Sequence, residues 1–159
     1  MIIYVMGVSG SGKSTIGQLL SDRLEIPFVD GDDFHPPTNV EKMRNGSPLN
    51  DEDRKGWLAA IHRFAYKAQH EKGAIIACSA LKTKYRDTLS KDLNSVRWVY
   101  LKGSFTEIKK RMEQRKNHFM PEALLQSQFD TLEEPKEAIV IGIEKSPEVI
   151  IEEVLPLLS

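Results

Sequence analysis

The sequence contains very little cysteine, since Cys78 is the only one in 159 residues. A single cysteine cannot form an intrachain disulfide, which excludes a disulfide-stabilised fold and is typical of a reducing cytoplasmic location. No apolar run approaches the ~20 residues that a membrane-spanning helix needs, so we expect no membrane partner. The chain enters an apolar segment directly at Ile2, without a basic stretch and cleavage site, so no secretory signal is expected.

An excess of charge of one sign is also missing. Lysine and arginine total 22, aspartate and glutamate total 23, and the formal net charge is −1. A surface that binds nucleic acid or an anionic membrane usually needs a strongly basic face, so the composition argues against both partners. Internal repeats and low-complexity segments are absent as well, and the length suits a single domain spanning residues 1–159.

The clearest pattern that is present is a phosphate-binding loop near the N-terminus. Residues 7–14 read GVSGSGKS and match the G-x-x-x-x-G-K-[ST] pattern called Walker A. The glycines let backbone N–H groups surround a polyphosphate. In such loops the lysine, here Lys13, adds a positive charge for the β- and γ-phosphates, and the Ser14 hydroxyl is placed to ligate Mg²⁺. The predicted nucleotide-binding residues of the loop are Gly7, Val8, Ser9, Gly10, Ser11, Gly12, Lys13, Ser14 and Thr15.

This loop lies between a predicted strand, Ile2–Met6, and a predicted helix, Thr15–Leu24, which has apolar residues at helical spacing. A flexible Gly/Ser turn that happens to contain a lysine is the alternative, and the combination of strand, motif and helix disfavours it. Further apolar runs predict four more strands, over 26–30, 74–78, 96–101 and 138–143. Strands that alternate with helices predict an α/β fold, a five-stranded parallel sheet with helices on both faces.

Capping residues place several helix ends. Asp51 is expected to be the N-cap of a long helix that ends at Gly73. Ser104 and Ser146 are expected to cap later helices, and Pro37 is expected to begin a short one.

Two carboxylates follow the second strand. Asp30 and Asp32 flank Gly31, and alternate residues of an extended stretch point the same way, so both could face the γ-phosphate. One could hold a water on Mg²⁺ and the other could accept a proton from a substrate hydroxyl, although a polar turn is the alternative. The third strand ends at Cys78 rather than at an acidic residue, so Asp30, or Ser79 through water, would have to act as the Walker B group.

Basic side chains lie near the loops at the same predicted edge. Arg54, Lys82 and Arg86 could grip an anionic substrate, most naturally a carboxylate. The alternatives are solvated surface charges and, for Arg54, an ion pair within its own acidic helix start.

A basic segment straddles a break between two later helices, where Arg111, Arg115, Lys116 and His118 lie. It predicts a lid around 111–131 whose arginines neutralise the transferring phosphoryl group and exclude water. The alternative is a basic helix C-terminus stabilised by the helix dipole. Neither His35 nor His118 has a second ligand at metal spacing, so neither is predicted to bind a metal.

Together these motifs resemble those of the gluconate kinase (gluconokinase) family, which is close to small P-loop kinases such as shikimate kinase and nucleoside monophosphate kinases. The resemblance covers most of the chain. It rests on the loop, which many P-loop proteins share, and on more specific segments at 30–43, 46–54, 78–87, 100–103 and 111–135. One departure is Gly56, where the family often has proline before the tryptophan.

The resemblance implies transfer of the γ-phosphoryl group of ATP to the 6-hydroxyl of D-gluconate, with ATP and Mg²⁺ as cofactors and a homodimer as the assembly. It makes Asp30 a ligand of Mg²⁺-bound water and Asp32 the partner or base of the substrate hydroxyl. It places Arg54 close to the position of an arginine that shikimate kinase uses on the substrate carboxylate. The implied sites are catalytic Lys13, Asp32 and Arg115; nucleotide-binding Arg111 beside the loop; substrate-binding Asp32, His35, Arg54, Lys82, Arg86 and Gln128; and metal-binding Ser14 and Asp30.

Three rival functions follow from the same residues. A kinase of this fold could act on shikimate or a nucleotide instead. A regulatory nucleotide switch is disfavoured because the chain contains no N-K-x-D sequence for reading guanine. A kinase of nucleic-acid ends is disfavoured by the net charge.

Overall fold

The computed structural model describes residues 1–114 and 120–158. In this part of the chain, five strands form one parallel sheet in the order β2-β3-β1-β4-β5. The strands are β1 (Ile2–Met6), β2 (Phe28–Asp30), β3 (Ala74–Ala77), β4 (Val96–Lys102) and β5 (Ile139–Gly142). The predicted five-stranded parallel sheet is therefore confirmed.

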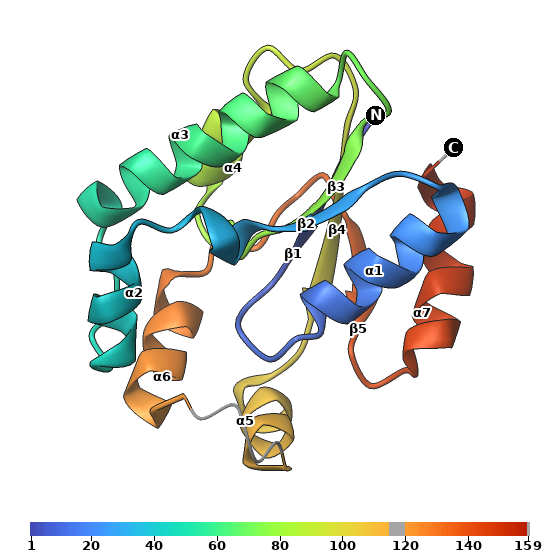
Figure 1. Cartoon of the computed structure of the whole chain (residues 1–159). Helices are drawn as coiled ribbons and strands as arrows, with labels where there is room; N and C mark the ends of the chain where they lie inside the picture. The colour runs from blue at the N-terminus through green and yellow to red at the C-terminus, as the bar shows by residue number, and fades with distance from the viewer. Residues whose placement is uncertain (115–119, 159) are drawn as a thin grey trace.

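Helices connect the strands and cover both faces of the sheet. They are α1 (Lys13–Leu24), α2 (Pro37–Arg44), α3 (Asp51–Ala68), α4 (Thr83–Ser90), α5 (Phe105–Gln114), α6 (Glu122–Thr131) and α7 (Pro147–Val154). Figure 1 shows α1 and α7 on one face and α3 and α4 on the other, with α2, α5 and α6 beyond the carboxyl ends of the strands. Within the described ranges, no helix is both long and apolar enough to cross a bilayer.

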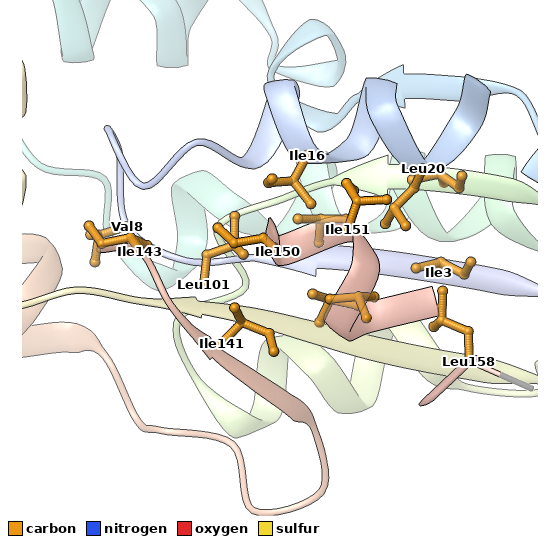
Figure 2. Packing of buried hydrophobic residues seen from close by; sticks show 14 of the residues in the cluster. Ile3, Val8, Ile16, Leu20, Leu101, Ile141, Ile143, Ile150, Ile151 and Leu158 are labelled. Carbon is orange, nitrogen blue, oxygen red and sulfur yellow. The ribbon is translucent and has the colours of Figure 1, made fainter. Parts of the chain in front are cut away.

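The central strand β1 shows why the sheet is buried from both sides. All five of its residues are 0% exposed. Ile3 and Val5 belong to one core cluster with α1 and α7, and Ile2, Tyr4 and Met6 belong to a second cluster with α3 and α4. Figure 2 shows the first cluster, in which the labelled residues include Ile3, Ile16, Leu20, Ile150 and Ile151. A continuous apolar run is what a parallel strand covered on both faces requires.

The capping predictions are confirmed at two helices and wrong at a third. Ser146 is the N-cap of α7, and the Ser104 hydroxyl accepts a hydrogen bond from the Glu107 N–H, at 3.1 Å. At α3 the cap is Asn50 rather than Asp51, and the Asn50 and Asp53 side chains each accept from the other's backbone N–H. Both Asn and Asp are favoured caps, so the pattern alone does not separate these neighbours.

The far end of α3 also differs from the prediction. The helix ends at Ala68, and Gly73 follows a turn in which its N–H donates to the Ala68 carbonyl at 2.9 Å. Gly73 has a φ of 85°, so it marks the end of that turn rather than of the helix.

The segment after β2 is a short 3₁₀-helix, η1 (Gly31–Phe34), where the sequence analysis expected an extended stretch or a polar turn. The Asp30 side chain caps it by accepting from the Asp32 N–H at 2.9 Å. A Cβ atom on Gly31 would lie 2.5 Å from the Ala77 carbonyl oxygen, so only glycine lets this segment pass so close to β3. This close approach sets η1 over the end of the sheet.

Candidate active site

The phosphate-binding loop follows β1 and leads into α1, as predicted. Gly10 and Gly12 have φ angles of 83° and 95°, in the left-handed region that glycine adopts freely. Gly12 is the N-cap of α1 and has no side chain to cap it, so the N–H groups of the first helical turn stay available for a ligand. A helix N-terminus of this kind is an anion-binding site.

A cavity of about 260 Å³ lies in front of this loop, and we refer to it as the loop cavity. It is lined by Ser9, Gly10, Gly12, Lys13, Ser14, Thr15, Asp30, Asp32, Met112 and Met120. The Ser14 hydroxyl donates to the Asp30 carboxylate at 2.9 Å, so two oxygen ligands of the kind that Mg²⁺ prefers lie side by side. No group of three or more His, Cys, Asp or Glu side chains among the described residues could hold a metal by itself. The donor set therefore fits Mg²⁺ in the usual way, with phosphates and waters as its other ligands.

A second cavity of about 170 Å³ adjoins the first, and we refer to it as the side cavity. Its wall mixes apolar and polar side chains: Ser9, Lys13, Asp32, His35, Met43, Pro48, Leu49, Arg54, Trp57, Ser79, Leu81, Met120, Leu124, Ser127 and Gln128. Ser9, Lys13, Asp32 and Met120 line both cavities. Lys13 and Asp32 therefore stand where a phosphate in one cavity would meet a small molecule in the other.

The two charged groups at this boundary influence each other. The Lys13 ammonium donates to the Val8 carbonyl at 3.0 Å. Burial lowers the pKa of Lys13, and the Asp32 carboxylate opposes that shift. Desolvation raises the pKa of Asp32, and the attraction of Lys13 opposes this shift. A carboxylate with a raised pKa is suited to accept a proton.

Arg54 reaches the side cavity from the first turns of α3, and its support comes from another helix. Its guanidinium donates to the Tyr85 hydroxyl of α4 at 3.0 Å rather than forming an ion pair with the start of its own helix. Tyr85 in turn donates to Asp51, which also accepts from Lys84 and, at 3.2 Å, from Lys82. These hydrogen bonds, that of Lys84 foremost, hold the pKa of Asp51 well below its usual range. Lys82 therefore helps to hold the Asp51 and Tyr85 side chains that position Arg54, and it does not line the side cavity.

Arg86 lies away from the side cavity. It is 7% exposed, and its guanidinium donates to the carbonyl oxygens of Ala80 at 2.6 Å and Glu133 at 2.7 Å. Burial lowers the pKa of Arg86. The structure places this predicted substrate contact inside the fold, where it ties the segment after β3 to the segment after α6.

Gln128 lines the side cavity, but its amide is occupied by the phosphate-binding loop. The side-chain oxygen accepts from the Ser9 N–H at 2.8 Å, and the side-chain nitrogen donates to the Ser9 hydroxyl at 3.0 Å. Arg111 of α5 lies on the other side of the loop and lines a third cavity, also of about 260 Å³, together with Gly12 and Thr15. The predicted lid residues Arg115, Lys116 and His118 lie outside the described residues, so their roles stay predictions.

Some residues of the site were not predicted from the sequence. Trp57 packs in the core, at 1% exposed, but it also lines the side cavity and stacks on His35 with ring centroids 4.2 Å apart. Asn39 and Tyr85 were not singled out. His35 precedes α2 and has an extended backbone, so helical spacing could not link it to Asn39 in the sequence.

Comparison with known proteins places this geometry in a family. The model of the shikimate kinase family matches residues 9–157. The curated thermoresistant gluconokinase of Escherichia coli (strain K12) is 44% identical over 155 residues, which cover 94% of this chain and 89% of that protein. The chain belongs to the gluconokinase family. The crystal structure of a gluconokinase from Sinorhizobium meliloti 1021 agrees with a TM-score of 0.90 at 40% identity, over 99% of this chain and 90% of that one.

A more distant structure agrees in fold alone. Shikimate kinase from Aquifex aeolicus VF5 has a TM-score of 0.65 at 22% identity, over 99% of this chain and 96% of that chain. The α/β fold of the gluconokinase family is therefore that of the small P-loop kinases, as the sequence predicted.

Proposed function

We propose that this chain is an ATP-dependent gluconokinase, which transfers the γ-phosphoryl group of ATP to the 6-hydroxyl of D-gluconate and releases ADP and 6-phospho-D-gluconate. The observation that carries this proposal is the junction of the two cavities at Lys13 and Asp32. One cavity is built around a phosphate-binding loop, and the other presents cationic and polar side chains to a small molecule. The curated gluconokinase relative supports the choice of acceptor.

The nucleotide would lie along the phosphate-binding loop. Its phosphates would accept from the loop N–H groups and from Lys13, and its nucleoside would extend toward the cavity that Arg111 lines. Ser14 and Asp30 would hold Mg²⁺, which when bound neutralises charge on the β- and γ-phosphates. Phosphoryl transfer depends mainly on positioning and charge stabilisation, and these groups supply both.

The acceptor would occupy the side cavity. The planar guanidinium of Arg54 suits a carboxylate, which it can bind with two parallel hydrogen bonds. Asp32 lies at the far boundary, next to the loop cavity, where it can orient or deprotonate the attacking hydroxyl. The sugar acid would therefore extend from its carboxylate at Arg54 to its reacting hydroxyl at Asp32.

The finer features of the proposal rest on the sequence. Arg115 and the lid around 111–131 would cover the transferring group. A homodimer follows from the family resemblance. A cytoplasmic location is supported by the lone cysteine, Cys78, which is buried as a free thiol.

An ADP-release assay with Mg²⁺-ATP tests this function. The acceptors are D-gluconate, other aldonates, shikimate, nucleoside monophosphates and none. Wild type is compared with Lys13→Ala and Asp32→Asn, and with Lys72→Ala as a control at an exposed lysine before β3. We expect strong stimulation by gluconate alone, reduced about 10²–10⁴-fold in both site variants and unchanged in the control.

Two results of this assay would contradict the proposal. If shikimate or a nucleotide replaced gluconate, the fold would stand and the substrate would be wrong. If no acceptor raised the rate above that of ATP alone, a regulatory nucleotide switch would be favoured.

A further inference from the structure

A buried asparagine of α2 has only one possible orientation. Asn39 is 3% exposed, and its side-chain nitrogen lies 2.8 Å from the backbone carbonyl oxygen of Asp53. A carbonyl oxygen can only accept a hydrogen bond, so the Asn39 atom that faces it must be the amide nitrogen. Rotating the amide by half a turn would place two acceptor oxygens against each other in a buried site, which is costly.

The same amide nitrogen determines where His35 carries its proton. The Asn39 nitrogen also lies 3.2 Å from the Nδ1 atom of His35, so its two hydrogens serve the Asp53 carbonyl and this ring nitrogen. An amide nitrogen only donates, so Nδ1 must accept, and the single proton of a neutral imidazole must be on Nε2. Burial lowers the pKa of His35 to about 4, with Arg54 adding to the shift, which agrees with a neutral ring.

The orientation of the His35 ring is also fixed, because the ring stacks on a neighbouring side chain. The ring stacks on Trp57 with centroids 4.2 Å apart and planes at 12°. The Trp57 indole is itself held, because its N–H donates to the Gly31 carbonyl at 2.8 Å. The His35 side chain is 4% exposed, yet His35 lines the side cavity. Its Nε2 atom is 3.9 Å from the nearer carboxylate oxygen of Asp32, too far for a direct hydrogen bond.

We propose that His35 is a substrate-binding residue whose Nε2–H donates a hydrogen bond to a hydroxyl of the polyhydroxy acid beside Asp32, and that Asn39 is the positioning residue that fixes this tautomer. A hydroxyl group can accept from Nε2–H and donate to Asp32 at once, because one hydroxyl oxygen both donates and accepts. The 3.9 Å separation of the two side-chain atoms leaves room for such a bridging oxygen. This inference rests on the proposed function, since it concerns the acceptor in the side cavity.

The geometry also separates the roles of His35 and Asp32. With Nδ1 occupied by Asn39 and Nε2 protonated, His35 has no free lone pair with which to accept a proton from the substrate. The carboxylate of Asp32 is an acceptor, so the proton of the attacking hydroxyl is directed to Asp32. A sugar acid that lacks a hydroxyl at the bridging position would leave the buried Nε2–H of His35 without an acceptor, and an unpaired buried group makes a site selective.

The tautomer can be measured without substrate. Nitrogen-15 NMR of the labelled protein near neutral pH distinguishes the two ring nitrogens, and the His35 signals are those that disappear in His35→Gln. We expect the proton on Nε2 in wild type and on Nδ1 in Asn39→Asp, because the new carboxylate accepts from Nδ1–H. A wild-type proton on Nδ1, or an unchanged tautomer in Asn39→Asp, would overturn the inference.

A pair of substitutions at His35 tests the hydrogen bond to the substrate. The amide nitrogen of glutamine can reach the position of Nε2, whereas the shorter asparagine amide reaches only the position of Nδ1. We expect kcat/KM for gluconate to fall about 30-fold or more in His35→Asn and less than about 5-fold in His35→Gln, with KM for ATP changed little in both. His70→Asn, at an exposed histidine beyond α3, is the matched control and should match wild type.

The outcomes separate this inference from the proposed function. Equal losses in His35→Asn and His35→Gln, with both variants folded in thermal unfolding, would overturn the hydrogen bond while wild type still phosphorylated gluconate. If gluconate did not stimulate ADP release by the wild-type protein, the proposed function would be contradicted, and the NMR result would still decide the tautomer.

Discussion

Three polar side chains of the side cavity, those of Arg54, His35 and Gln128, are each held by a neighbour. The Arg54 guanidinium donates to the Tyr85 hydroxyl, and the Tyr85 hydroxyl donates to the Asp51 carboxylate. The guanidinium carbon also lies 5.3 Å from the centre of the Tyr85 ring, so a cation–π interaction with the ring adds to the hydrogen bond with the hydroxyl. The orientation of the group that we assign to the substrate carboxylate is therefore set by a residue that need not touch the substrate.

Tyr85→Phe tests this arrangement. The ring remains, but Arg54 loses its acceptor and Asp51 loses one donor. We expect KM for gluconate to rise about 5- to 10-fold, the equivalent of one hydrogen bond, while KM for ATP stays constant. Steady-state kinetics with each substrate varied in turn gives the answer, and Tyr66→Phe on an exposed part of α3 is the control. Unchanged kinetics would mean that Arg54 does not need this support.

His35 also makes the stability of the protein depend on pH. Its pKa is about 4 in the folded chain against an ordinary value of 6.5, with Arg54, Asp32 and the neutral Asn39 as the polar groups facing it. Between these values the unfolded chain binds the extra proton. The free energy of unfolding should therefore fall as pH drops from 6.5 toward 4, by at most about 1.4 kcal/mol per pH unit from this residue.

Denaturant unfolding of wild type and His35→Gln at several pH values measures this contribution. The glutamine variant should lose less stability on acidification, because it has no group that titrates at this position. Parallel losses in both proteins would contradict the low pKa of His35.

At the scale of single residues, the sequence located the groups that belong to local motifs. Lys13, Ser14 and Asp32, which line the loop cavity, could be predicted as candidates because the loop and the strand end that present them are continuous in the chain. Arg86 was expected in the site because it is basic and follows β3. Its partner Glu133 is 47 residues away, and a contact over that separation cannot be read from local spacing.

Helix α6 builds the side cavity together with α2 and α3, which lie far from it in the sequence. Residues from α2, α3 and α6 line it, and Gln128 of α6 joins it to the phosphate-binding loop through both the backbone N–H and the hydroxyl of Ser9. Local signals at the helix starts, such as Pro37 and the capping region at Asp51, were enough to predict α2 and α3. They could not predict the connection between Gln128 and Ser9, which spans 119 residues, or the one-residue shift of the α3 cap to Asn50.

Gly56 is a position where α3 can be stabilised. It lies within the helix, is exposed, and a Cβ atom there would meet no other atom within 4 Å. Gly56→Ala should raise the free energy of unfolding by about 0.5–1 kcal/mol, because alanine restricts the unfolded chain and favours the helix. Denaturant unfolding measures the change.

Gly73→Ala is the matched control for this substitution. Gly73 has a positive φ, and a Cβ atom on it would lie 2.2 Å from the Met1 carbonyl oxygen, so this variant should be less stable than wild type. A loss of stability in Gly56→Ala as well would contradict the reasoning for α3.

At the scale of the whole molecule, the order of the strands assembles the site. Because β1 pairs with β3 and β3 pairs with β2, the segments that follow these three strands meet at one edge of the sheet. They contribute the phosphate-binding loop, then Asp30 and Asp32, and then Ser79. Ligands of open α/β sheets bind outside the carboxyl ends of the strands, and here two neighbouring cavities lie at that edge.

In the proposed function, this edge of the sheet delivers a phosphoryl group to the hydroxyl farthest from the carboxylate of gluconate. ADP release with D-gluconate and with 6-deoxy-D-gluconate tests it most directly. We predict turnover with gluconate, and with the deoxy compound no turnover but competitive inhibition against gluconate, since Arg54 can still bind its carboxylate. Comparable turnover with both compounds would show that another hydroxyl is phosphorylated and would contradict the placement of the acceptor between Arg54 and Asp32.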